Sequence, residues 1–266
     1  MGPRDVDSLE TPSLAEVSQS EVNWNPLLGL IFALITFGLI TTVAVPVIVY
    51  SILTFAGRTS EQASNTLQSG IIWQFVAVLL AEGGLVWAVW WFLRRHKRSL
   101  RVIGLRRLRW SDPAAALAGF GVYFVAYIVL LSVVMHYVPA FNAGQKQELG
   151  FDHVHGTSNM LLTFVSLVMI PPVAEEVLFR GFIFTSLRKN LRFAWSALIT
   201  GLLFAVAHLE FGSGRSLVWV AALDTFTLSL VLCYLREKTN SLWPGIFLHA
   251  LKNSIAFISL YLLHLG

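Results

Sequence analysis

Seven apolar runs divide this chain, and each is long enough to cross a lipid bilayer as a helix. They lie at about 27–55, 70–93, 113–137, 159–187, 193–209, 216–235 and 242–265. A spanning helix needs about 17–25 mainly apolar residues, because backbone polar groups must be satisfied internally within the hydrocarbon. With 56% hydrophobic and 13% charged residues, the sequence predicts an all-α, polytopic transmembrane helix bundle of about seven spans.

The polar segments suggest three regions. Residues 1–25 are predicted to be a disordered N-terminal tail, because they carry five acidic residues against one arginine. Residues 26–158 are predicted to form N-terminal transmembrane helices, and residues 159–266 a transmembrane core that holds the candidate site. Cys233, the one cysteine, excludes an internal disulfide and is expected to be inert packing.

The basic residues predict the orientation in the membrane. Residues 94–109 hold eight lysines and arginines and no acidic residue. If the N-terminus is cytoplasmic, this segment and most other basic residues also face the cytoplasm, as the positive-inside rule requires. We therefore expect a multi-pass protein of the inner or plasma membrane. Because the basic segment lies between two spans, the bilayer is the expected partner and nucleic acid is not.

The fourth run contains charges that need a specific environment. Glu175, Glu176 and Arg180 lie in an otherwise apolar stretch, where insertion of each costs about 2.5–3.5 kcal/mol. Glu176 and Arg180 are four residues apart and can pair on one helical face. Glu175 is rotated by about 100° and is the carboxylate left for chemistry. The Pro171-Pro172 pair predicts a break or kink just before the glutamates.

Two later runs place further polar groups at a similar depth. His208 ends the fifth run, and His249 and Asn253 lie in the seventh. At about 1.5 Å per helical residue, Glu175, His208 and His249 are about 16–22 Å from the predicted cytoplasmic ends of their helices. A carboxylate, two imidazoles and an amide suffice to hydrolyse a peptide bond, with Glu175 and His208 activating water and His249 and Asn253 facing the oxyanion.

These residues fall into three motifs in a fixed order between about residues 160 and 265. The matches are Glu175-Glu176-x-x-x-Arg180 to EExxxR, Phe204-x-x-x-His208 to FxxxH and His249-x-x-x-Asn253 to HxxxN. In this pattern the chain resembles the CPBP family of intramembrane proteases, which includes the type II CAAX prenyl endopeptidases and bacterial Abi relatives.

The resemblance implies an intramembrane endopeptidase that hydrolyses a peptide or protein substrate, either prenylated or embedded in the membrane. It implies Glu175 as the base, with the histidines and Asn253 around the scissile carbonyl. Glu176 and Arg180 would be the supporting pair. Combined with the expected orientation, it places hydrolysis near the cytoplasmic side.

The sequence leaves the need for a metal open. Glu175, His208 and His249 could ligate Zn²⁺ with one open position, and the family is often named as metalloproteases. The chain has no His-Glu-x-x-His helix, and a carboxylate can activate water without a metal. We expect no tight structural zinc. His153 and His155 could also bind metal, but a solvated loop is the expected explanation of that pair.

A non-enzymatic membrane protein is the alternative: a transporter, a bacteriocin-immunity protein or a scaffold. A proton-coupled transporter would use Glu82, Asp224 and Glu175 as a relay. Such proteins often show matching repeats, and none is found here. Lys252 is unusual beside Asn253. It is expected to pair with Asp224 or Glu82, to alter substrate preference, or to mark a member that has lost turnover. Phe204 is expected to be a packing residue and not a catalytic one.

Overall fold

A computed structural model describes residues 21–145, 151, 154–209 and 217–263. These residues contain helices and connecting turns and no strand. Six helical segments are long and apolar enough to cross a membrane, and a further apolar helix, Phe193–Ala207, is shorter. The prediction of an all-α, multi-pass bundle with about seven spans is confirmed. Residues 1–20, His153 and the predicted loop at 210–215 lie outside the described residues.

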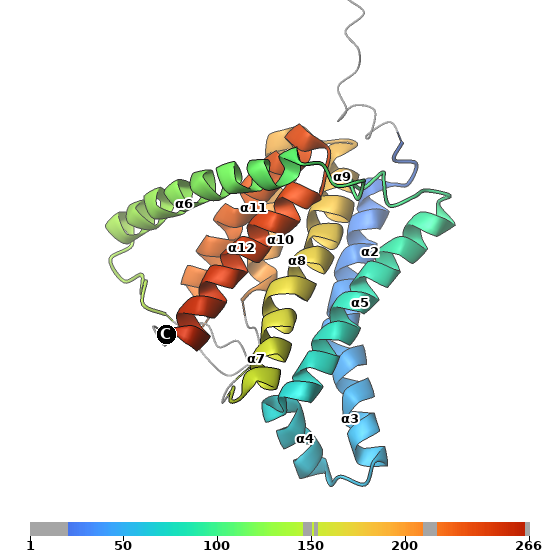
Figure 1. The fold of residues 1–266 in the computed structure, drawn as a ribbon. Coiled ribbons are helices and arrows are strands. Elements are labelled where there is room, and N and C mark those ends of the chain that lie inside the picture. Colours follow the sequence, from blue (N-terminus) through green and yellow to red (C-terminus); the bar gives the residue numbers. More distant parts are fainter. Residues whose placement is uncertain (1–20, 146–150, 152–153, 210–216, 264–266) are drawn as a thin grey trace, which may run out of the picture.

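The N-terminal half forms three spans and one short amphipathic helix. In the order of the chain they are α2 (Pro26–Gly38), π-helical η1 (Leu39–Ala44), α3 (Val45–Phe55), α4 (Ser60–Ser69), α5 (Ile71–Arg95) and α6 (Ser111–Tyr137). The first span, α2 to α3, runs antiparallel to α5, and α4 connects their far ends (Figure 1). A capping box of Thr59 and Gln62 starts α4.

The fourth span alternates between α- and π-helical turns. It contains α7 (Thr157–Phe164), η2 (Val165–Met169), α8 (Ile170–Glu175), η3 (Glu176–Ile183) and α9 (Phe184–Arg188). The helix continues through Pro171 and Pro172, so the expected break does not occur. The two prolines lie directly after the π-helical turns of η2, where the regular α-helical hydrogen-bond pattern is already shifted. The glutamates thus lie within a continuous span.

The last three helices are α10 (Phe193–Ala207), α11 (Trp219–Thr239) and α12 (Trp243–Phe257), and α12 continues into π-helical η4 (Ile258–Leu262). The α10 helix packs along α11, and α6 crosses both α11 and α12 (Figure 1). The fourth span is central, because α8 packs against both α5 and α12. Its next segment, η3, packs against α2, α5, α10 and α11, so five helices surround the segment that carries the two glutamates.

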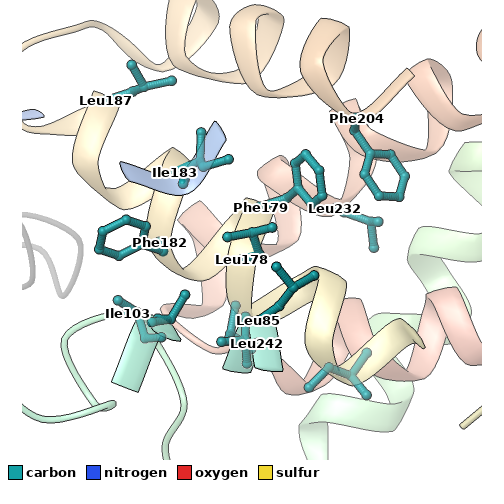
Figure 2. Packing of buried hydrophobic residues seen from close by; sticks show 14 of the residues in the cluster. Leu85, Ile103, Leu178, Phe179, Phe182, Ile183, Leu187, Phe204, Leu232 and Leu242 are labelled. Carbon is teal, nitrogen blue, oxygen red and sulfur yellow. The ribbon is translucent and has the colours of Figure 1, made fainter. Parts of the chain in front are cut away.

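The hydrophobic core is built around η3. All eight residues of Glu176–Ile183 are buried. Figure 2 shows Phe179 beside Phe204 of α10, with their ring centroids 4.9 Å apart, and Leu85 of α5 belongs to the same buried cluster. Because this core surrounds η3 on every side, Glu176 and Arg180 are enclosed by protein rather than by lipid.

The packed structure begins earlier than the sequence predicted. Val22 and Trp24 are buried, although both fall in the predicted tail. Trp24 stacks on Phe182 and donates a hydrogen bond from Nε1 to the Ser186 hydroxyl at 2.9 Å. The predicted end of the tail at residue 25 is therefore too late. Trp24 fixes this otherwise polar segment to the core, because its ring is apolar and its N–H can donate a hydrogen bond.

The basic segment after α5 packs against the turn between α11 and α12. Arg106 donates to the Thr239 carbonyl, and its own carbonyl accepts a hydrogen bond from the Trp243 indole, both at 2.6 Å. Gly104 has a φ of +90°, and a Cβ there would lie 2.6 Å from Nε of Arg236. These contacts bring the basic segments after α5 and α11 to one end of the bundle, as the predicted topology requires.

Candidate active site

The buried charge pair has the partners that its spacing predicts. Nη1 of Arg180 lies 2.9 Å from Oε1 of Glu176, and both side chains are almost completely inaccessible. The Arg180 guanidinium also lies over the Phe204 ring, 4.1 Å from its centroid. Phe204 therefore packs, as expected, and adds a cation–π contact to a desolvated charge. Breaking such a pair leaves an uncompensated charge in the core.

A glycine makes room for this pair. A Cβ at Gly245 would lie 2.7 Å from Oε2 of Glu176, which is closer than real Cβ contacts allow. Gly245 is in the first turn of α12, so its missing side chain lets α12 approach η3. Sequence reasoning missed this residue, because a glycine near the start of a helix gives no signal of what faces it.

His249 lies between the two glutamates. Its Nδ1 is 3.4 Å from Oε1 of Glu176, and its Nε2 is 3.8 Å from Oε2 of Glu175. The imidazole is buried, and its Nδ1 makes no hydrogen bond within the described residues. The His249 imidazole, on α12, thus lies between the Glu176–Arg180 ion pair and the carboxylate of Glu175.

Glu175 is the glutamate without a cationic partner. Its Oε2 is buried and has no hydrogen-bond partner among the described residues, while 16% of its side chain remains accessible. It ends α8, directly before the π-helical η3, and among the described residues Arg180 forms its ion pair with Glu176 and not with Glu175. This arrangement leaves a carboxylate that can accept a proton.

His208 also lies against the ring of Phe204, the residue that packs on Arg180. Its ring is 4.5 Å from the Phe204 ring, whose edge also faces His249. Nδ1 is 2.8 Å from the Phe204 carbonyl, which fixes the ring and leaves Nε2 for another partner. No hydrogen bond or ion pair joins His208 to Glu175 within the described chain, so a water or substrate atom would have to link them.

Asn253 has a contact that the sequence did not indicate. Its Nδ2 donates a 2.9 Å hydrogen bond to the main-chain carbonyl of Leu167 in η2. A π-helical turn shifts the backbone pairing by one residue, and such turns are frequent at functional sites. One of the two amide hydrogens therefore holds α12 against the fourth span, and one remains for a ligand.

Two of the additional acidic residues also lie near the site. Asp224 accepts from Lys252, with Nζ to Oδ2 at 2.7 Å, which confirms one of the expected pairings. Tyr123 of α6 donates to the other oxygen of Asp224. Glu82 of α5 is near enough to interact electrostatically with Glu175, and its Oε2 is buried without a described hydrogen-bond partner.

The predicted zinc ligands are not gathered into one cluster, and the need for a metal stays a prediction. Within the described residues, no group of three or more His, Cys, Asp or Glu side chains is placed to hold a metal ion. Glu175 and His249 approach each other, and the contact of His208 Nδ1 with a backbone carbonyl leaves its Nε2 available. No step proposed below passes through a metal.

A largely apolar cavity of about 540 Å³ lies along the end of α10 and the start of α11. Ala205 and Leu209, which flank His208 in sequence, are part of its wall, together with Trp219 and Phe226. None of the predicted catalytic residues lines it. The cavity could therefore accept an apolar group close to His208 but not at Glu175 itself.

Comparison with known proteins identifies the same region. Residues 157–255 match the family model described as Type II CAAX prenyl endopeptidase Rce1-like, and this range includes all three motifs. The UPF0177 protein YxdF of Lactococcus lactis is 26% identical over 169 residues, which are 64% of this chain and 86% of that protein.

Two further relatives match shorter stretches. The putative membrane peptidase YdiL of Bacillus subtilis is 25% identical over 143 residues, or 54% of each chain. An uncharacterized 24.3 kDa protein of Escherichia coli is 32% identical over 95 residues, 34% of this chain and 41% of that protein. The chain thus spans about half or less of these two relatives. No solved structure matches it.

Proposed function

We propose that this protein is an intramembrane peptidase with Glu175 as its catalytic base, and the match of residues 157–255 to the Type II CAAX prenyl endopeptidase Rce1-like family supports the proposal. One observation carries the proposal. Arg180 pairs with Glu176, whose side chain is 1% accessible, whereas the adjacent Glu175 has no described arginine or lysine partner, is 16% accessible and lies 3.8 Å from His249. Two neighbouring carboxylates thus have different environments and different roles.

Hydrolysis would begin with a water held between Glu175 and Nε2 of His208. Glu175 takes one proton from this water as its oxygen attacks the scissile carbonyl carbon, and the carbonyl oxygen becomes an oxyanion. His249 and the second amide hydrogen of Asn253 would face that oxygen. When the carbon–nitrogen bond breaks, the proton on Glu175 passes to the leaving amine, which restores the carboxylate.

The surroundings support a substrate that reaches the site from within the membrane. Five helices pack against the fourth span, and the cavity beside His208 can accept an apolar group. We therefore propose a membrane-embedded or prenylated polypeptide as the substrate. The positive-inside rule favours a cytoplasmic N-terminus, an inner or plasma membrane location, and hydrolysis on the cytoplasmic side of the bilayer.

Cleavage by purified protein in detergent tests the proposal. The substrates are peptides that end in a CAAX sequence, with and without the prenyl group, and a membrane-embedded peptide. Wild type is expected to cleave at least one of them, and Glu175→Ala none. Mass spectrometry of the products identifies the bond. If wild type cleaves none of them, or if Glu175→Ala cleaves as well as wild type, the assignment fails.

The same preparation addresses the transporter alternative. Glu82 and Asp224 are the other acidic residues that a proton relay would need. A peptidase that depends on Glu175 should keep cleaving after Glu82→Gln. Proton uptake by proteoliposomes that depends on Glu82, without peptide cleavage, would instead support transport.

A further inference from the structure

A second charge pair lies at the edge of the proposed active site and is built from three helices. Lys252 of α12 places Nζ 2.7 Å from Oδ2 of Asp224 in α11. The phenol of Tyr123 in α6 donates to Oδ1 of the same aspartate. Both Asp224 oxygens are therefore engaged, and the aspartate is fixed against two helices.

The position of Lys252 relates this pair to the catalytic residues. It directly precedes Asn253 and follows His249 by three residues, so all three share one face of α12. Through His249 and Asn253, this face of α12 approaches Glu175 and the Leu167 carbonyl of the fourth span. A cation is thus held beside the atoms that would bind the substrate carbonyl.

The Lys252 ammonium is held in place, yet it still has hydrogens to donate. An unpaired ammonium at membrane depth is costly, and Asp224 compensates for it. An ammonium has three N–H donors, and within the described residues Asp224 is its one partner. The Lys252 side chain also remains 23% accessible.

The other donors near the site are less available. Arg180 is completely buried beneath Phe204 and bound to Glu176. The Asn253 amide already donates one hydrogen to the Leu167 carbonyl. Among the described side chains around Glu175, Lys252 is therefore the cation that a substrate oxygen could reach.

We propose that Lys252 is a further catalytic residue, which donates a hydrogen bond from its ammonium to the oxyanion of the tetrahedral intermediate, while Asp224 and Tyr123 position it. This inference rests on the proposed peptidase function.

The charges balance through the reaction. As the water oxygen bonds to the carbonyl carbon, Glu175 accepts a proton and becomes neutral. The carbonyl electron pair moves to its oxygen, so the negative charge passes from Glu175 to an atom beside Lys252, and the site's net charge does not change. Collapse of the tetrahedral intermediate breaks the carbon–nitrogen bond, and the proton on Glu175 passes to the leaving amine. Lys252 keeps its proton throughout.

The test measures kcat and KM separately for Lys252→Met, Lys252→Arg and the control Lys238→Met. Lys238 lies at the end of α11, over the Tyr234 ring and away from the site. Lys252→Met should lower kcat by about 10²-fold with little change in KM, the effect of losing one oxyanion donor. Lys252→Arg should keep more activity, and Lys238→Met should equal wild type.

Lys252→Met leaves Asp224 unpaired and could unfold the protein. The double variant Asp224→Asn with Lys252→Met removes both charges, and it should fold with a melting temperature near wild type but keep the low kcat. A substrate peptide with a phosphonate in place of the scissile amide supplies an anion like the oxyanion. Wild type should bind it at least tenfold more tightly than an uncharged ethylene isostere, and Lys252→Met should lose this preference.

The outcomes separate this inference from the proposed function. If wild type cleaves and Glu175→Gln does not, but folded Lys252→Met keeps wild-type kcat, the Lys252 role is wrong and the peptidase stands. A change confined to KM would make Lys252 a substrate-binding residue and would also overturn the inference. If wild type cleaves nothing, the proposed function itself fails.

Discussion

Oε2 of Glu176 and Cα of Gly245 approach each other so closely that a Cβ on residue 245 would stand 2.7 Å from the carboxylate oxygen. The other oxygen of this carboxylate, Oε1, is held in the buried ion pair with Arg180, so the group cannot move into solvent. Any side chain at residue 245 must therefore displace α12, which carries His249 and Asn253.

Gly245→Ala should consequently lower peptidase turnover strongly. A displacement of about 1 Å in a catalytic group can reduce the rate by about 10²-fold. The matched control is Gly121→Ala in α6, where a Cβ would meet nothing within 4 Å. Turnover and melting temperature are measured for both. Equal activity of the two variants would show that the contact has no functional consequence.

Arg180 should be required mainly for stability. Replacing it with methionine leaves Glu176 as an uncompensated buried charge, which costs about 3–5 kcal/mol. The double variant Glu176→Gln with Arg180→Met removes both charges and should recover much of the lost stability. Thermal unfolding in detergent measures the difference. Equal melting temperatures for the single and double variants would contradict a coupled pair.

A metal-dependent mechanism makes a different set of predictions. With Glu175 as the base, a chelator should change turnover little, and Asn253→Ala should lower kcat by about 10²-fold. With catalytic zinc, a chelator should stop cleavage until Zn²⁺ is restored, and His208→Ala or His249→Ala should lose bound metal. Metal content and turnover measured together on these variants decide between the two mechanisms.

The orientation follows from the basic residues and can be tested independently of activity. Reporter fusions within 94–109 should read cytoplasmic, and fusions within 143–158 should read external. The opposite pattern would place the basic end of the bundle outside the cell. It would also move the proposed site of hydrolysis to the other side of the membrane.

The spans and the charge pairs Glu176–Arg180 and Asp224–Lys252 could be predicted from sequence, and most other contacts between helices could not. The apolar runs indicated the spans, and the four-residue spacing of Glu176 and Arg180 indicated their ion pair. Nothing local indicated that Trp24 would reach Ser186 or that Asn253 would bind the Leu167 carbonyl. Such contacts depend on where two helices meet, and here also on π-helical turns that no composition signal marks.

The different roles of two adjacent glutamates are the central claim, and the cleavage rates of Glu175→Gln and Glu176→Gln test it most directly. Glu175→Gln should fold with an unchanged melting temperature and lose about 10²–10⁴-fold or more in kcat, as expected for loss of a general base. Glu176→Gln should lower the melting temperature and keep measurable turnover when folded. A folded Glu175→Gln with wild-type kcat, beside an inactive but stable Glu176→Gln, would contradict the assignment.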